Sequence, residues 1–262
     1  MTITITARAR HWAMAAGCSL GLLSGPAAAQ DTAQDVAQNP GRIIVLINPN
    51  SNEAATQSMA GLAQAAIGDA AKVEGRSNAG APALLTTPED MANAVPGVVA
   101  IGTEAAADPR VAALIVSAFS DPGLPELRAA VEIPVFGIGE EVFHEAARDG
   151  RPFGIVTVTP DEKLVESFRQ KAAALGYEAQ YRGVRVTPGD PTELVQDPAR
   201  LDAALAEAVG QSTGKDGAEA VIMGGGPLSA SAVRLQPQFD QPLVVAVTAA
   251  ARAAAKQVAR AD

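Results

Sequence analysis

IIVLINPNSNE at residues 43–53 decides the fold, because a continuous apolar run passes through Asn-Pro straight into a helix-forming segment. FGIVTVTPDEK at residues 153–163 repeats this order of apolar run, polar residue, proline and helix. Continuous Val/Ile runs separated by helices are typical of strands buried on both faces in a parallel sheet. The sequence therefore predicts an α/β protein in two similar parts.

Two further pairs of segments match in the same order. AALIVSAFSDPGL, ending at Leu124, corresponds to EAVIMGGGPLSAS from Glu219, and IPVFGIGEEVFHEAA from Ile133 corresponds to QPLVVAVTAAARAAA from Gln241. Pro49 and Pro160 lie 111 residues apart, and Pro134 and Pro242 lie 108 apart. We predict two flavodoxin-like parallel-sheet half-domains, arising by internal duplication and related by a pseudo-twofold axis, with a central cleft.

The same pattern gives expected boundaries. Strands are predicted at residues 42–48, 113–119, 134–138, 153–158, 220–224 and 243–247, with helices at about 50–70 and 160–176. The first half-domain is assigned to residues 42–139 and the second to 140–235. A C-terminal strand and helix, 236–262, is expected to complete the first half-domain in part.

The N-terminal segment, residues 1–29, has the three-part pattern of a secretory signal. Arg8 and Arg10 precede an apolar stretch at 12–23, and the segment ends in Ala27-Ala28-Ala29. Cleavage after Ala29 is predicted, followed by a disordered lead-in at 30–41 and a periplasmic or secreted location. Lipidation at Cys18 and an uncleaved anchor are the alternatives; the lipidation motif is imperfect because Ala15 stands where a large aliphatic residue is expected.

Composition limits the chemistry of the mature chain. The only cysteine (Cys18) would leave with the signal, and one imidazole, His144, would remain. Disulfides, thiol catalysis and Cys/His zinc sites are thereby excluded, and no metal is expected. Loss of Arg8 and Arg10 leaves 18 basic against 29 acidic residues, a net charge of −11, which disfavours nucleic acid. No later apolar run reaches the length of a membrane span, and the Ala-rich helices permit a homo-oligomer.

Each predicted half has two candidate ligand-binding segments. Asn48 and Thr159 are expected to cap the following helices, with Pro49 and Pro160 in the first helical position. Free backbone N–H groups there would favour a carboxylate. Small-residue turns at 117–123 and 224–227 follow the next matched strands, where ligands of open parallel sheets bind.

These motifs together resemble the aspartate/glutamate/hydantoin racemase superfamily, and its hydantoin racemase branch most closely. The motifs are Ile47-Asn48-Pro49-Asn50-Ser51-Asn52, the run from Ala118 to Leu124, PVFGI at 134–138, FGIVT at 153–157 and the segment 224–228. The resemblance extends from about residue 42 to the C-terminus. It implies cofactor-free isomerase activity on an amino acid or a cyclic amide, in which two cysteines on opposite faces of the substrate carbon exchange its proton.

The chain departs from this pattern at both cysteine positions, which fall at Ala118 and Gly225. Neither side chain can transfer a proton, so the two-cysteine mechanism is absent. Asp121, Asp161 and His144 are the alternative bases, and each also has an ordinary structural explanation in a turn or a helix.

Three alternatives stay open: a racemase-family enzyme with a different base, an exported non-catalytic binder of a small carboxylate or cyclic amide, or an inert structural homologue that binds no ligand. The retained INPNS motif counts against the third. The residues expected around the ligand are Asn48, Asn50, Ser51, Phe119, Ser120, Thr157, Gly225 and Gly226. Asn48 and Ser51 would hold a carboxylate, and Gly225 and Gly226 would offer backbone N–H groups.

Overall fold

The computed structural model describes residues 41–225 and 228–260. The predicted signal segment (1–29), Cys18, the lead-in up to residue 40 and Gly226 lie outside these residues. Within the part of the chain that is described, no helix is long and apolar enough to cross a membrane.

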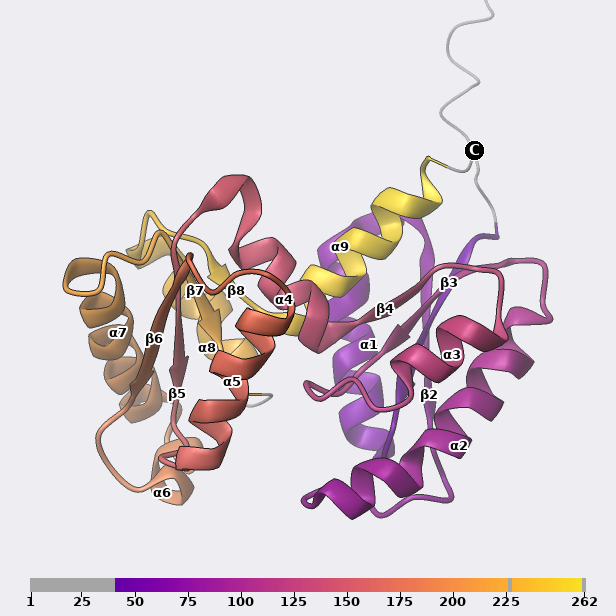
Figure 1. Cartoon of the computed structure of the whole chain (residues 1–262), viewed down its shortest axis with the longest axis horizontal. Coiled ribbons are helices and arrows are strands. Elements are labelled where there is room, and N and C mark those ends of the chain that lie inside the picture. Colours follow the sequence, from indigo (N-terminus) through magenta and orange to yellow (C-terminus); the bar gives the residue numbers. More distant parts are fainter. Residues whose placement is uncertain (1–40, 226–227, 261–262) are drawn as a thin grey trace, which may run out of the picture. The chain divides into compact units, whose positions relative to one another are not determined.

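Two four-stranded parallel sheets organise the chain (Figure 1). The first has the order β2-β1-β3-β4, and the second has the same order, β6-β5-β7-β8. The strands are β1 (Ile43–Asn48), β2 (Lys72–Ser77), β3 (Val111–Val116), β4 (Val135–Gly137), β5 (Phe153–Thr157), β6 (Tyr181–Val186), β7 (Ala220–Met223) and β8 (Leu243–Val244). The predicted α/β class with two parallel-sheet half-domains is confirmed.

A helix follows each strand, and the helices that join two strands of one sheet form the crossovers that parallel pairing requires. The helices are α1 (Glu53–Ile67), α2 (Pro88–Ala106), α3 (Leu124–Ala130), α4 (Ile138–Ala146), α5 (Glu162–Ala174), α6 (Pro191–Gln196), α7 (Pro198–Gly214), α8 (Leu228–Leu235) and α9 (Ala246–Val258). Asp197 caps α7, accepting hydrogen bonds from the amides of Ala199 and Arg200 at 3.1 Å each.

The first sheet is covered on both faces, which explains its continuous apolar strands. Alternate β1 residues point to opposite sides. Ile44 and Leu46 pack with the side that holds α1 and α9, whereas Val45 and Ile47 pack with the side that holds α2 and α3. All four side chains are fully buried.

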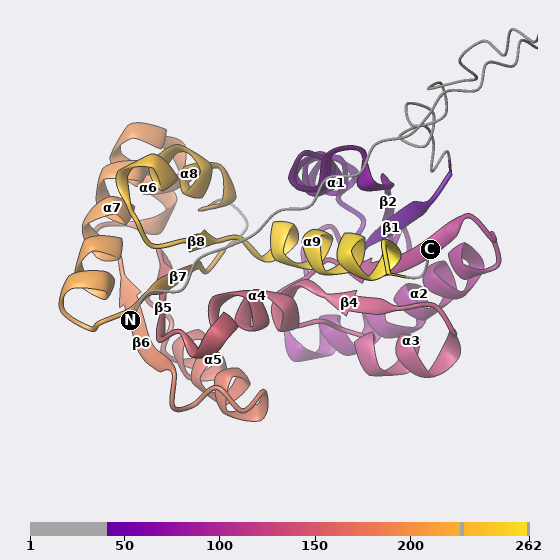
Figure 2. The same ribbon diagram turned by 90° about the horizontal axis from the view of Figure 1, so that it is seen from above.

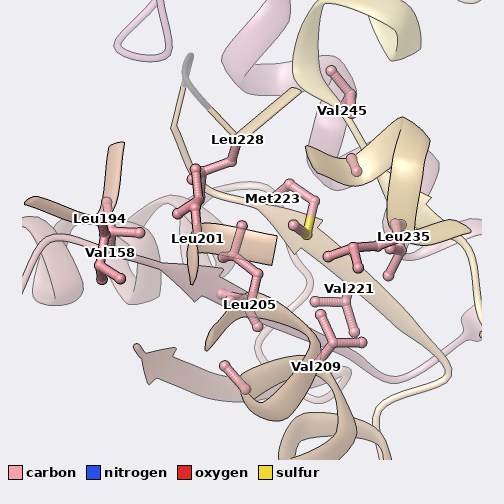
Figure 3. Close-up of a cluster of buried hydrophobic side chains, with 14 of the residues drawn as sticks. Val158, Leu194, Leu201, Leu205, Val209, Val221, Met223, Leu228, Leu235 and Val245 are labelled. Carbon is pink, nitrogen blue, oxygen red and sulfur yellow. The ribbon is translucent and has the colours of Figure 1, made fainter. Parts of the chain in front are cut away.

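The second sheet has the same two-sided packing. Val156 and Val221 belong to a cluster with α7 and α8, shown in Figure 3. Phe153 and Ile155 pack on the other face against α4 and α5.

Two helices cross between the half-domains. Helix α4 follows β4 of the first sheet, yet its Val142 and Phe143 are buried in the core of the second sheet. Helix α9 follows β8 of the second sheet, yet it lies alongside α1 of the first half-domain (Figure 2). Its Val247, Ala250 and Ala254 are buried in the core of the first sheet. The C-terminal helix therefore packs on the first half-domain and the terminal strand on the second.

Several predicted boundaries were wrong. The strand expected at 113–119 ends at Val116, because a turn closes by a hydrogen bond from Asp121 N to Ala118 O at 2.9 Å. The strand expected at 243–247 ends at Val244, and α9 begins at Ala246.

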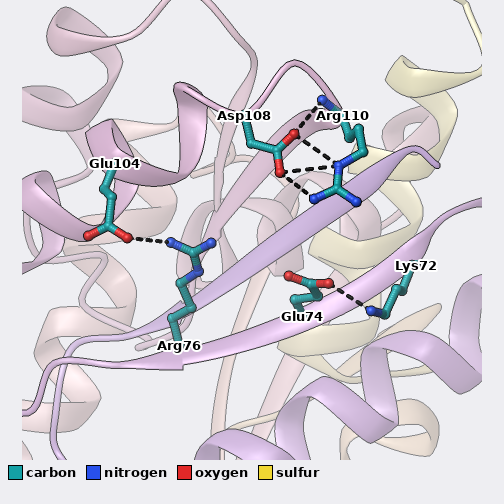
Figure 4. Close-up of polar contacts among 6 residues, drawn as sticks. All are labelled: Lys72, Glu74, Arg76, Glu104, Asp108 and Arg110. Carbon is teal, nitrogen blue, oxygen red and sulfur yellow. Dashed lines mark hydrogen bonds and ion pairs between the residues drawn. The ribbon is translucent and has the colours of Figure 1, made fainter.

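Polar edge strands were missed altogether. β2 (KVEGRS) and β6 (YRGVRV) each pair with one neighbour only, so much of each strand is partly exposed. Figure 4 shows Lys72 paired with Glu74 within β2, and Arg76 with Glu104 of α2. Charged side chains on an edge strand disfavour pairing with a further strand.

An acid-dependent contribution to stability arises beside β3. Arg110 donates to both carboxylate oxygens of Asp108, and its side chain followed by its amide lowers the pKa of Asp108 from 3.8 to about 2 (Figure 4). Because the folded state binds this proton more weakly than the unfolded chain, the stabilisation is present above pH 3.8 and is lost as pH falls toward 2.

We expect Asp108→Asn to lower the unfolding temperature at pH 6 and to have a much smaller effect near pH 2, where the pKa of Asp108 in the folded chain lies. Thermal unfolding followed by circular dichroism across this range measures the effect. Asp240→Asn is the control, since Asp240 is exposed and has no ion pair among the described residues. A deficit of Asp108→Asn that persists unchanged at pH 2 would contradict the assignment.

Candidate functional site

Ala118 and Gly225 occupy equivalent places in the two half-domains. After β3, Ser117 N donates to Ile47 O of β1 at 2.8 Å; after β7, Gly224 N donates to Val156 O of β5 at 2.8 Å. Ala118 and Gly225 are the next residues, at the carboxyl ends of the central strands. Open parallel sheets bind ligands at this end.

The turns that begin at these residues also match. Asp121 N donates to Ala118 O at 2.9 Å, and Leu228 N donates to Gly225 O at 3.1 Å. Asp121 is therefore the counterpart of Leu228.

The sequence pattern paired Asn48 with Thr159, but in the structure Asn48 corresponds to Thr157. Asn78 N donates to Asn48 O and Thr187 N to Thr157 O, each at 2.9 Å, after β2 and β6. The sequence pairing was wrong because it aligned Pro49 with Pro160. Pro49 directly follows Asn48, whereas Pro160 lies three residues beyond Thr157.

Asn48 organises the loop after β1. Its buried side chain donates from Nδ2 to Asn50 Oδ1 and Thr56 Oγ1 at 2.9 Å each, and its Oδ1 accepts from Asn50 N at 3.2 Å. These contacts use both Nδ2 hydrogens inside the protein.

The helix caps differ from the prediction. Asn52, not Asn48, caps α1, accepting from Ala55 N at 3.0 Å, and Asp161, not Thr159, caps α5, accepting from Leu164 N at 2.7 Å. An extra turn separates strand from helix in both halves, so Pro49 and Pro160 lie before the helices.

Most loop donors expected to be free are internally bonded. The amides of Asn50, Ser51 and Asn52 donate to Asn48 Oδ1, Pro82 O and Asn50 Oδ1. Ser51 Oγ and Asn50 Nδ2 have no hydrogen-bond partner within residues 41–225 and 228–260. These two groups are side-chain donors that the loop after β1 can offer a carboxylate or carbonyl.

In the second half-domain, polar groups at the carboxyl end of β5 bond to one another. Thr157 is fully buried and donates from Oγ1 to Gly224 O at 3.0 Å, while Thr159 N donates to Thr157 Oγ1 at 3.3 Å. Gly225 is exposed. Thr187 Oγ1 is buried without a partner in the described chain.

Phe119 and Ser120 differ in environment. The Phe119 ring packs edge-on against Phe168 and Phe143, with centroid distances of 5.2 and 6.1 Å. Ser120 is exposed, and its hydroxyl contacts Met91 Sδ at 3.2 Å. Phe119 thus anchors the turn on the second half-domain.

Both carboxylate oxygens of Asp121 are occupied. Lys171 Nζ lies 2.5 Å from Oδ2, and Gly139 N donates to Oδ1 at 2.8 Å. Burial raises the pKa of Asp121 above its ordinary value, while the Lys171 charge and these hydrogen bonds oppose the shift. Asp121 has a positive φ of 52°, a conformation that Asp tolerates better than most residues.

Asp161 and His144 have structural partners. Asp161 is the exposed cap of α5. His144 Nδ1 hydrogen-bonds with the Tyr177 hydroxyl at 2.7 Å, and Nε2 lies 3.5 Å from Glu140 Oε1. Glu140 is in turn paired with Arg128 at 2.8 Å.

No cluster suited to a metal ion occurs among the described residues. A surface depression of about 420 Å³ is lined by Gln64, Gly68, Asp69, Ala71 and Lys72. Lys72 pairs with Ile43 at the amino ends of β2 and β1, so this depression lies at the end of the first sheet opposite to Ala118.

Several residues around the site were not predicted from sequence: Thr56, Ser77, Asn78, Gly139 and Lys171. Ser77 Oγ lies 2.6 Å from Thr56 Oγ1 and donates to Glu53 Oε2, extending the Asn48 network. Nothing in the sequence distinguishes Lys171 from the other charged residues of α5, because its partners lie about fifty positions away.

Comparison with known proteins agrees with this architecture. The family model described as Asp/Glu/Hydantoin racemase matches residues 44–254. A hydantoin racemase from Rhizobium meliloti is 30% identical over 211 residues, covering 80% of this chain and 86% of that protein. A hydantoin racemase from Paenarthrobacter aurescens is 24% identical over 216 residues, covering 82% and 91%.

Solved structures show the same fold. The structure of allantoin racemase from Klebsiella pneumoniae superposes with a TM-score of 0.74 at 23% identity, covering 84% of this chain and 89% of that one. With the family model spanning nearly all of the two half-domains, the chain belongs to the Asp/Glu/hydantoin racemase family.

Proposed function

We propose that this protein binds a 5-substituted hydantoin, or a related small amino-acid-derived carboxylate, beside Ala118 and Gly225, and that it does not invert the ligand by the two-thiol route. The observation that carries this proposal is the equivalence of the two positions. They begin matching turns at the carboxyl ends of β3 and β7, and neither bears a group that can move a proton.

The related proteins support this class of ligand. They are hydantoin and allantoin racemases, and allantoin is itself a hydantoin substituted at C5. A hydantoin ring presents two carbonyl oxygens, which match the donors Ser51 Oγ and Asn50 Nδ2, neither of which has a partner among the described residues.

Proton exchange by a different base is the second candidate function. Asp121 favours it, because burial raises the pKa of its carboxyl group and its turn starts at Ala118. A carboxylate base works best when its pKa approaches the working pH. Its bonds to Lys171 and Gly139 oppose this role, since the base would have to leave both partners.

Incubation of the full chain with allantoin and 5-benzylhydantoin in D2O at pH 7 separates the two functions. Proton NMR follows ligand line width, which reports binding, and loss of the C5 proton signal beyond a protein-free sample, which reports base catalysis. We expect broadening without added exchange. Exchange of the C5 proton above the protein-free rate would contradict a purely binding function and support catalysis by a different base. Unchanged line widths together with no added exchange would contradict both functions.

Ser51→Ala tests the position of the ligand. We expect the variant's dissociation constant for the hydantoin that shows line broadening to rise by about 5- to 10-fold, because one uncharged hydrogen bond is lost. Ser58→Ala is the matched control, because Ser58 is exposed on α1 and makes no side-chain hydrogen bond among the described residues. Equal affinities of the two variants would contradict the placement beside Ser51.

A further inference from the structure

One lysine of the second half-domain holds the turn that carries Ala118. Lys171, near the end of α5, donates from Nζ to Phe119 O at 3.0 Å and to Asp121 Oδ2 at 2.5 Å. The same ammonium group lies 5.7 Å from the centroid of the Phe119 ring. All three contacts fall on residues 119–121, directly after Ala118.

The turn is fixed from a second direction by α4. Gly139, in the first turn of that helix, donates its amide to Asp121 Oδ1 at 2.8 Å. An added Cβ at Gly139 would lie 1.8 Å from Phe119 O, so helix and turn are in direct backbone contact. The turn is therefore held between α4 and α5, both of which pack on the second sheet.

The fold itself does not demand a charge at this position. The equivalent residue of the second half-domain is Leu228, which is fully buried in an apolar cluster. The Asp121 side chain is only 6% exposed and that of Lys171 23%, so forming this pair costs desolvation of both groups. A buried ion pair is often no more stabilising than an apolar substitute, but it is specific in geometry.

We propose that Lys171 is a positioning residue of the ligand site, which sets the place of Ala118 through Phe119 O and Asp121. This inference rests on the proposed hydantoin-binding function. Lys171 acts through the turn rather than by contact with the ligand; it fixes the wall of the site on which Ala118 lies. Removal of its charge frees the turn while the aromatic packing of Phe119 keeps the half-domains folded.

Lys171→Met tests this role, because methionine keeps the apolar stem and loses all three donors. Lys163→Met is the matched control: Lys163 lies on the same helix, is exposed and has no polar partner among the described residues. Circular dichroism establishes that both variants fold. Amide hydrogen exchange of residues 118–121 reports the turn, and titration with 5-benzylhydantoin reports the site.

In Lys171→Met we expect exchange of these amides to accelerate at least tenfold and the dissociation constant to rise at least tenfold, because a hydrogen bond to a charged group stabilises more than a neutral one. Lys171→Arg, which retains the charge, should restore part of both effects, and Lys163→Met should change neither. Unchanged exchange in Lys171→Met would overturn the proposal, as would faster exchange with unchanged affinity. If the natural chain binds no hydantoin, the proposed function fails, and amide exchange alone then decides whether Lys171 positions the turn.

Discussion

Replacing Ala118 and Gly225 together by cysteine should give the chain a hydantoin-inverting activity. Inversion requires one group that removes the C5 proton from one face and another that returns a proton to the opposite face. Each thiol would stand at the start of one of the two matching turns after β3 and β7. A positioned acid or base contributes roughly 10²–10⁴-fold, so the double variant should exceed either single variant by at least about 10²-fold.

The local structure accepts both substitutions. Among residues 41–225 and 228–260, a Cβ at Gly225 would meet Leu228 alone, at 3.6 and 3.7 Å, which is ordinary van der Waals contact. Gly225 does not have a positive φ. Ala118 already carries a Cβ and is only half-buried. Neither change requires the backbone to move.

Polarimetry on single enantiomers of 5-benzylhydantoin measures inversion, and NMR in D2O measures exchange. Each single cysteine variant should exchange the proton of one enantiomer and keep its configuration, because it has a base on one face only. The matched control is Ala118→Ser/Gly225→Ser, which has similar size but no comparable acidity. A folded, hydantoin-binding double cysteine variant that inverts no faster than this control would refute the equivalence of the two positions with the family's bases.

The buried parts of the fold were predictable from the sequence, and its edges were not. β1, β3, β5 and β7 lie at the centres of their sheets, and burial on both faces left a continuous apolar signal in each. β2 and β6 lie at edges, where partial exposure permits charged residues that erase this signal.

The candidate site was likewise predictable from the sequence only in part. Ala118 and Gly225 could be paired from the sequence because they align in the matched segments at 112–124 and 219–231. The structure gives the turns that begin at them equivalent hydrogen bonds. The cap residues could not be located, because Asn48, Asn50 and Asn52 are all good caps and only the folded loop shows which one faces the helix. The link between Lys171 and Asp121 is equally invisible, since pairing across fifty residues has no local pattern.

Replacing Gly139 by alanine should destabilise the chain by about 3 kcal/mol, the upper part of the usual range for overpacking. The new Cβ would lie 1.8 Å from Phe119 O and 2.6 Å from Lys171 Nζ. A flexible lysine can move, but a backbone carbonyl cannot move without its turn. Phe119 O is held by Lys171, and its ring is packed between Phe143 and Phe168, so relief of the clash would have to break these contacts.

Urea unfolding measures this loss against two glycine controls. Gly61→Ala adds a methyl group to an exposed position of α1, where no atom of the described chain lies within 4 Å of it. It should stabilise the chain by about 0.5–1 kcal/mol, because alanine is the better helix former. Gly225→Ala should be close to neutral, since its Cβ has room beside Leu228. A Gly139→Ala chain as stable as either control would show that α4 and the Ala118 turn are not in contact. The two variants differ in what they change: Lys171→Met removes the ion pair and leaves the Asp121 carboxylate buried without its partner, whereas Gly139→Ala forces the close backbone approach apart. Because loss of one member of a buried pair is itself destabilising, both variants should lose stability and hydantoin affinity.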